Sequence, residues 1–125
     1  MKMHNAWLLL PALLLSAAVQ AATVEKYDEA AFNQARASGA PVLIDVYADW
    51  CPVCKRQMRE LTPLFAQPAQ RDLRVFTLNF DTQRAALKSF RVSQQSTLIL
   101  YRNGQEVRRS IGETSPQALA DFLRH

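Results

Sequence analysis

Hydrophobic and polar positions change their spacing several times along the chain, and each change marks a predicted element. Residues 42–48 form a continuous β-favouring run without alternation, which is typical of a strand covered on both faces. After Cys51 the period becomes helical, with apolar side chains on one face at Cys54, Met58, Leu61 and Phe65. We expect Pro63 to break or kink this helix, and Thr62 could equally cap a second helical piece reaching Ala69.

The rest of the pattern predicts further strands and helices. Helices are expected over residues 29–38 and 82–90 and after Pro116, and strands over 74–80, 97–101 and 106–111. Asp28 and Ser115 are N-cap candidates. Asn103 and Gly104 form the strongest short hairpin signal, because both residues tolerate a positive φ. The alternation of strands and helices, followed by a hairpin, predicts an α/β domain.

The N-terminal segment has the features of a secretory signal peptide. Lys2 supplies a positive start, residues 7–19 are an apolar run, and small side chains precede a cleavage site after Ala21. A spanning helix needs about 20 apolar residues, so this run is short for a membrane anchor, although an uncleaved anchor stays an alternative. We expect residues 1–21 to be removed and residues 22–125 to form one periplasmic domain.

Composition and charge change this picture little. The 125 residues are 49% hydrophobic, with 15 Lys and Arg against 11 Asp and Glu, for a formal charge of +4. The length and the apolar fraction are typical of one globular domain. The basic residues are scattered rather than gathered into a run, so we expect no nucleic-acid partner.

The two cysteines lie where the buried strand turns into a helix, which makes a Cys-x-x-Cys pair a strong redox signal. Cys51 would be the helix N-cap, where free N–H groups and the helix dipole stabilise a thiolate. Cys54 lies on the same face, close enough to resolve a mixed disulfide formed by Cys51. Pro52 and Val53 would tune the pair, and Trp50 could shield it or contact partners, or simply pack.

A cysteine pair at this spacing has three other interpretations. A structural disulfide across so short a loop removes only about 2 kcal/mol of chain entropy. A zinc site needs four ligands, but the two histidines of the sequence are His4 in the signal segment and His125 at the C-terminus. Two soft thiolates also suit Cu(I), which therefore stays an alternative. We expect no resident metal and no cofactor.

Asp45 interrupts the apolar strand six residues before Cys51. A carboxyl group buried there would have its pKa raised by desolvation and could relay a proton to or from Cys54. The alternative is a structural Asp, hydrogen-bonded or at the strand end. Lys55, Arg56 and Arg59 could add positive potential, but a solvated helix face explains most of them.

Residues 42–55 resemble the active-site segment of thioredoxins, and residues 47–51 are especially similar to the C-terminal periplasmic domain of DsbD-type electron transporters. The resemblance continues through residues 96–104 and the closing helix. It implies the thioredoxin-like fold, an α/β fold with a central mixed sheet, a C-terminal antiparallel hairpin and helices on both faces. It also implies that Cys51 is the nucleophile, Cys54 the resolving thiol and Asp45 a buried acid.

Ser96 departs from that family pattern, because the family has a cis-proline directly before Thr-Leu, facing the cysteines. A non-proline cis bond costs about 3 to 4 kcal/mol, so we expect a trans Gln95–Ser96 bond and an altered loop at residues 94–96. Gln95 and Ser96 would then form a changed substrate platform, with more space beside the sulfurs and a hydroxyl group near them.

The predicted function is that of an exported thiol-disulfide oxidoreductase acting on protein thiols and disulfides. We favour a reductase, because of Asp45, the absence of a histidine between the cysteines, and the lack of the inserted helical domain typical of DsbA-like oxidants. A reductase in an oxidising compartment needs an electron donor, and the resemblance implies a membrane transporter of the DsbD or CcdA type. We expect a monomer. The alternatives are a disulfide oxidase and a Cu(I)-binding or metallocentre assembly module.

Overall fold

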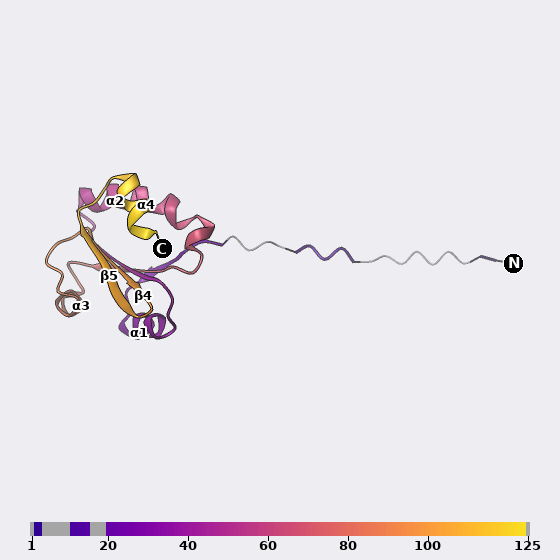
Figure 1. Cartoon of the computed structure of the whole chain (residues 1–125), viewed down its shortest axis with the longest axis horizontal. Coiled ribbons are helices and arrows are strands. Elements are labelled where there is room, and N and C mark those ends of the chain that lie inside the picture. Colours follow the sequence, from indigo (N-terminus) through magenta and orange to yellow (C-terminus); the bar gives the residue numbers. More distant parts are fainter. Residues whose placement is uncertain (1, 4–10, 16–19, 125) are drawn as a thin grey trace.

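The computed structural model describes residues 2–3, 11–15 and 20–124, and its centre is a mixed β-sheet (Figure 1). Within these residues the sheet has five strands in the order β1-β3-β2-β4-β5. The strands are β1 (Thr23–Lys26), β2 (Val42–Tyr47), β3 (Arg74–Asn79), β4 (Thr97–Arg102) and β5 (Gln105–Ile111). β3 runs parallel to β1 and β2, whereas β4 is antiparallel to β2 and to β5. The predicted mixed sheet with a C-terminal antiparallel hairpin is confirmed.

The described part of the chain also has four α-helices, which cover the two faces of this sheet (Figure 1). They are α1 (Glu29–Ala37), α2 (Pro52–Phe65), α3 (Arg84–Ser89) and α4 (Pro116–Leu123). Helices α1 and α3 bury Phe32 and Leu87 in one apolar cluster, and α2 and α4 bury Leu61 and Leu119 in another. Strand β2 contributes to both clusters, which explains why its sequence is apolar without alternation.

Several local expectations are confirmed by the geometry. The Asp28 carboxylate accepts the Ala31 N–H at 2.9 Å and caps α1, and Ser115 caps α4. Asn103 and Gly104 both have positive φ, 50° and 78°, at the turn of the β4–β5 hairpin. The helices and strands shared with the prediction differ from it by one or two residues at their ends, where frayed turns are hard to place from sequence.

Strand β1 was not predicted. Its sequence is only four residues long and includes Glu25 and Lys26, so it carries little hydrophobic signal. Backbone pairing makes it a strand, because the Thr23 N–H donates to the Leu73 carbonyl at 3.0 Å and the Tyr27 N–H to the Thr77 carbonyl at 2.9 Å. An edge strand of this kind depends on a partner that lies about 50 residues away in the chain.

Of the two outcomes expected at Pro63, a break or a kink of the helix, the break does not occur. The helix continues to Phe65, and a separate 3₁₀ turn follows at Pro68–Gln70. Pro63 lies on the exposed side of the last turn, where its missing N–H removes one hydrogen bond, to the carbonyl of the exposed Arg59, and only two residues of the helix follow it. The Thr62 hydroxyl donates to the Met58 carbonyl at 2.8 Å, so Thr62 does not cap a second helix.

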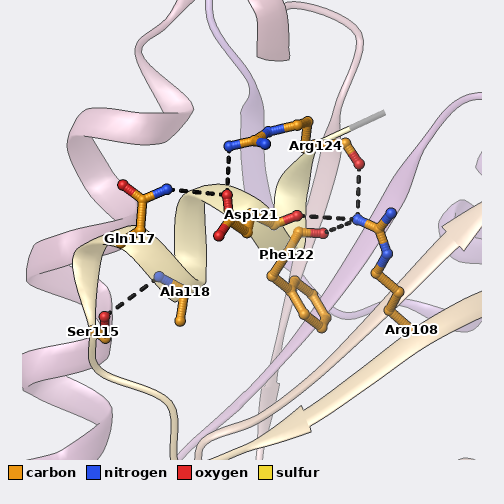
Figure 2. Close-up of polar contacts among 7 residues, drawn as sticks. All are labelled: Arg108, Ser115, Gln117, Ala118, Asp121, Phe122 and Arg124. Carbon is orange, nitrogen blue, oxygen red and sulfur yellow. Dashed lines mark hydrogen bonds and ion pairs between the residues drawn. The ribbon is translucent and has the colours of Figure 1, made fainter.

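Arginine side chains connect helices to the hairpin, and Arg36 and Arg108 are two examples. Arg36 of α1 lies over the rings of Phe32 and Tyr101 and donates from Nε and Nη2 to the Gly104 carbonyl at 3.1 and 2.6 Å. Arg108 of β5 donates to carbonyls at the C-terminal end of α4, including that of Phe122 at 2.8 Å (Figure 2). The last carbonyls of a helix lack the N–H groups of a following turn, and Arg108 supplies donors to them, although the Asp121 carbonyl also accepts the Arg124 N–H at 3.2 Å.

The predicted signal segment falls largely outside the described residues, since residues 1, 4–10 and 16–19 are not among them. Its role therefore stays a prediction. Among the residues that are described, no helix is long and apolar enough to cross a bilayer.

Candidate functional site

Cys51 and Cys54 lie at the N-terminal end of α2, directly after the central strand β2. A hydrogen bond from the Cys51 N–H to the Ala48 carbonyl, 3.1 Å long, forms the turn between strand and helix. Cys51 is the N-cap, and its Sγ accepts the Cys54 N–H at 3.1 Å. Pro52 follows at the first helical position, where its ring suits the helix and its missing N–H leaves no donor unpaired. The predicted capping role of Cys51 is confirmed.

The two sulfurs are joined in a disulfide, with Cα atoms 5.3 Å apart, inside the usual range for such bonds. Both residues are buried, Cys51 at 5% and Cys54 at 6% exposure, so total exposure does not distinguish them. Their surroundings do. The Cys51 sulfur faces a backbone N–H at the positive end of the helix, whereas Cys54 faces a pocket that also contains Asp45.

Asp45 lies on β2 and is almost fully buried, at 3% exposure. Burial raises the pKa of its carboxyl group to about 7. Its neighbours across the sheet are Thr77 on β3 and Leu98 on β4, neither of which carries a charge to offset the desolvation. Burial and the direction of the pKa shift are as expected for Asp45, and its part in proton transfer stays a prediction.

A pocket of about 320 Å³ connects Asp45 to Cys54. It is lined by Asp45, Tyr47, Ala48, Asp49, Cys54, Lys55, Met58 and Thr77. A proton can leave or reach either group through such a space if water enters it. The pocket thus supplies the physical basis for coupling the carboxyl group of Asp45 to the thiol of Cys54.

The loop before β4 is altered as predicted. The structure has no cis peptide bond among its described residues, so the Gln95–Ser96 bond is trans, and Ser96 has a φ of 58°. Its N–H donates to the Val46 carbonyl at 2.7 Å. Ser96 Oγ lies 2.9 Å from Cys54 Sγ and 3.5 Å from Cys51 Sγ, which places a hydroxyl group where the family pattern has a proline ring. Gln95 is half-buried beside it.

The other predicted residues surround the disulfide at the surface. Trp50 is 61% exposed, and its Nε1 donates to the Asp81 carboxylate at 2.9 Å. Trp50 is therefore not a packed core aromatic, and its contact with partners stays a prediction. Pro52 is exposed and Val53 half-buried. Lys55, Arg56 and Arg59 are exposed, as expected of a solvated helix face.

Two residues of the site were missed by the sequence reasoning. Asp81 follows β3 and could not be paired with Trp50 without the fold. Gln57 is 1% exposed on α2, where the helical period predicts an apolar residue, and its amide donates to the backbone of Ser96. A polar residue at an apolar position of the period was the signal available for Gln57.

The donors available to a metal ion are few in the folded domain. Across the residues that the structure describes, no three His, Cys, Asp or Glu side chains lie close enough to hold a metal ion together. The thiols of Cys51 and Cys54 are the only soft ligands of the sequence besides methionine.

Comparison with known proteins agrees with this geometry. Residues 21–125 match the family model "Thioredoxin". The chain is 34% identical over 100 residues to thioredoxin of Mycobacterium tuberculosis, covering 80% of this chain and 85% of that protein. It is 34% identical over 89 residues to thioredoxin of Haemophilus influenzae, covering 69% and 79%. The crystal structure of Trxlp from Edwardsiella tarda superposes with a TM-score of 0.81 at 83% identity, covering 82% of this chain and all of that one. The chain therefore belongs to the thioredoxin family and is a thiol-disulfide oxidoreductase.

Proposed function

We propose that this chain is exported to the periplasm and reduces disulfide bonds of other proteins there. The observation that carries the proposal is the hydrogen bond from the Cys54 N–H to Cys51 Sγ at the start of α2. A sulfur in this position is stabilised as a thiolate by the N–H group and by the helix dipole. Cys51 is therefore the attacking group, and Cys54, held one helical turn further on, is the resolving group.

The reaction follows from these positions. The Cys51 thiolate attacks one sulfur of a partner's disulfide, which forms a mixed disulfide and releases the other partner sulfur as a thiolate. Cys54 then loses its proton and attacks the Cys51 sulfur. The Cys51–Cys54 bond forms, the bond to the partner breaks, and the second partner sulfur leaves as a thiolate. The partner gains two electrons, and the chain ends in the disulfide form that the structure shows.

Asp45 serves the resolving step in this proposal. Its carboxyl group shares a pocket with Cys54 and has a pKa of about 7, so near neutral pH it can accept the proton that Cys54 must lose. The signal-like segment at residues 1–21 supports export. The likeness of residues 47–51 to DsbD-type domains supports a membrane electron donor of the DsbD or CcdA type. We propose that the chain works as a monomer, because one chain contains both cysteines and Asp45.

The reduction potential of the Cys51–Cys54 pair tests the direction. Equilibration of the purified chain with glutathione mixtures should give a value towards the thioredoxin end of the known range, about −270 mV, rather than the DsbA end, about −120 mV. The variant Cys54→Ala, which cannot form the disulfide, gives the baseline. A potential near the DsbA end would contradict the reductase and favour the oxidase.

Partner identity can be read from trapped complexes. Cys54→Ala should accumulate mixed disulfides at Cys51 with its partners, whereas the matched variant Cys51→Ala should not, because the attacking sulfur is gone. Mass spectrometry of complexes that dithiothreitol releases identifies the partners.

Titration of the reduced chain with Cu(I) tests the copper alternative, with Cys54→Ala as the comparison. Tight stoichiometric copper binding that needs Cys54, together with no trapped protein, would contradict the proposed function.

A further inference from the structure

The Ser96 hydroxyl is in contact with the reacting sulfurs. Its Oγ lies 2.9 Å from Cys54 Sγ and 3.5 Å from Cys51 Sγ, and Ser96 is buried at 2% exposure. Neither sulfur of a disulfide carries a hydrogen, so the hydroxyl group is the donor, and its single hydrogen serves the nearer sulfur. The shorter contact is to Cys54, the sulfur that has no backbone donor recorded at the start of α2. The hydroxyl is therefore aimed at the resolving cysteine.

The backbone of Ser96 is held in place from three sides. Its N–H donates to the Val46 carbonyl at 2.7 Å, and its own carbonyl accepts the Gly112 N–H at 2.9 Å and the Gln57 amide at 3.2 Å. These bonds maintain a left-handed φ of 58°, which a serine does not adopt without such support. The position of the hydroxyl group is consequently determined by the surrounding fold and not by the loop sequence alone.

Gln57 supplies the bond that reaches this loop from α2. The side chain is 1% exposed, one turn after Cys54, and its Nε2 donates to the Ser96 carbonyl at 3.2 Å and to the Glu113 carbonyl at 3.0 Å. Both partners are acceptors, so the NH₂ side of the amide must face them, and both of its hydrogens are used. An apolar residue here would leave two carbonyls without this donor. Gln57 thus ties the helix of the cysteines to the loop of Ser96.

We propose that the Ser96 hydroxyl is a catalytic group that donates a hydrogen bond to the Cys54 thiolate when the mixed disulfide is resolved, and that Gln57 positions it. This inference rests on the proposed reaction, in which Cys54 attacks the Cys51 sulfur. The Cys54 proton passes to the pocket that contains Asp45, while Ser96 keeps its own proton and stabilises the anion that remains. Electrons and bonds balance as in the reaction above, because Ser96 forms no covalent bond.

Titration of Cys54 alone measures this effect. In reduced Cys51→Ala the only thiol is Cys54, and its alkylation rate against pH gives its pKa. Adding Ser96→Ala should raise that pKa by about one unit, which lowers the thiolate fraction about tenfold near neutral pH. Ser96→Gly should do the same, and glycine accepts the left-handed φ without strain, so it keeps the loop backbone. The charged groups facing Cys54 in its pocket, Asp45, Asp49 and Lys55, are unchanged in every variant.

Resolution kinetics give an independent measurement with both cysteines present. A chain carrying a thionitrobenzoate mixed disulfide on Cys51 releases the coloured thiolate when Cys54 attacks. The higher pKa lowers the Cys54 thiolate fraction about tenfold, but a more basic thiolate is also a better nucleophile. The second effect offsets about half of the first on a logarithmic scale. Resolution at neutral pH should therefore slow about threefold in Ser96→Ala and in Ser96→Gly.

Thr97→Val is the matched control. Its hydroxyl lies in the same loop and donates to the Gln94 carbonyl at 2.7 Å, with no sulfur contact recorded, so removing it should leave the Cys54 titration unchanged. Gln57→Met removes the positioning amide at similar volume and should raise the Cys54 pKa in the same direction. Combined with Ser96→Ala it should add little, because both changes act through one hydroxyl group.

Three outcomes would overturn the inference. Ser96→Ala and Ser96→Gly could both titrate like their parent, Thr97→Val could shift Cys54 as far as they do, or Gln57→Met could add its full effect to that of Ser96→Ala. None of these results bears on whether the chain reduces protein disulfides, which the reduction potential and the trapped complexes decide. Conversely, a reduction potential of the Cys51–Cys54 pair near the DsbA end would refute the proposed function. The effect of Ser96 on the Cys54 pKa could still be measured in that case.

Discussion

Two requirements conflict at the residues of the site: a sulfur must ionise there, and water is largely excluded, which destabilises a charge. Cys51 meets them with a backbone N–H at 3.1 Å, a donor that costs no extra burial of charge. Asp45 is shielded from water but has no charged partner on the neighbouring strands, so its burial destabilises the carboxylate form. A buried carboxyl group without a partner destabilises the fold, and proton transfer to and from Cys54 would explain its presence in an otherwise apolar strand.

The cost of Asp45 predicts an unusual pH dependence of stability. With a folded-state pKa of about 7 and an unfolded value of about 3.9, the folded state binds more protons between these values. Stability contributed by Asp45 is therefore lost as pH rises from about 4 to above 7. Asp45→Asn removes this loss. At pH 8 we expect the oxidised variant to be more stable than the parent by roughly 2 to 4 kcal/mol, and at pH 4 by much less.

Urea unfolding of oxidised Asp45→Asn and parent at pH 4 and pH 8 checks this. Asp49→Asn, on an exposed carboxylate beside the same pocket, is the control and should show no comparable gain at pH 8. A difference between Asp45→Asn and parent that is the same at both pH values would show that the side chain acts through packing and not through its proton.

Helices and strands are joined here by contacts that no local pattern reveals. Arg36 is the clearest case: it stacks on two aromatic rings of the core and closes the β4–β5 hairpin through the Gly104 carbonyl, 68 residues away. An isolated hairpin is at best marginally stable, so a fixed attachment to α1 contributes to its order. Arg108 provides a second attachment, between β5 and the end of α4.

Arg36→Lys should separate these contributions from simple charge. Lysine keeps the positive charge but has neither the planar stacking surface nor the two-pronged donor. We expect a loss of about 1 to 2 kcal/mol in the free energy of unfolding. Arg59→Lys, on the exposed face of α2, is the matched control and should change stability by less than about 0.5 kcal/mol. Equal effects of the two substitutions in urea unfolding would contradict the role assigned to Arg36.

On the scale of the whole molecule, the folded domain begins close to the predicted cleavage site after Ala21. The Ala22 N–H donates to the Phe65 carbonyl at 2.9 Å, and β1 begins at the next residue. Contacts of the sheet thus begin directly after Ala21. Residues 13–15, in contrast, are among the most exposed apolar side chains of the described chain.

Removal of residues 1–21 should therefore leave the fold intact. We expect a chain beginning at Ala22 to match the full chain in unfolding free energy within about 0.5 kcal/mol, while a chain beginning at Tyr27 should be markedly less stable because it lacks β1. In a Gram-negative host, mass spectrometry of the periplasmic fraction should find the N-terminus at Ala22. Full-length protein confined to the cytoplasm would contradict export.

Hydrophobic period and turn chemistry were sufficient for most of the secondary structure and for the redox pair. The buried strand β2, the capped helix after Cys51 and the Asn103–Gly104 turn depend on contacts within a few residues, so local sequence contains their cause. Strand β1 and the continuation of α2 to Phe65 escaped prediction, because the first needs β3 as a partner and the second depends on the exposed position of Pro63 in the last turn.

The amino-acid sequence alone was enough to establish an α/β domain with Cys51 at the start of a helix, a second cysteine within reach of it, and a carboxyl group in a buried strand. Folding in three dimensions settled which groups meet: Ser96 against the Cys54 sulfur, Gln57 against the Ser96 carbonyl, and Trp50 against Asp81. Each of these contacts joins residues 31 to 42 positions apart. Their distances depend on the packing of α2 against the sheet and on the path of the loop before β4, and these are properties of the assembled fold that no short segment encodes.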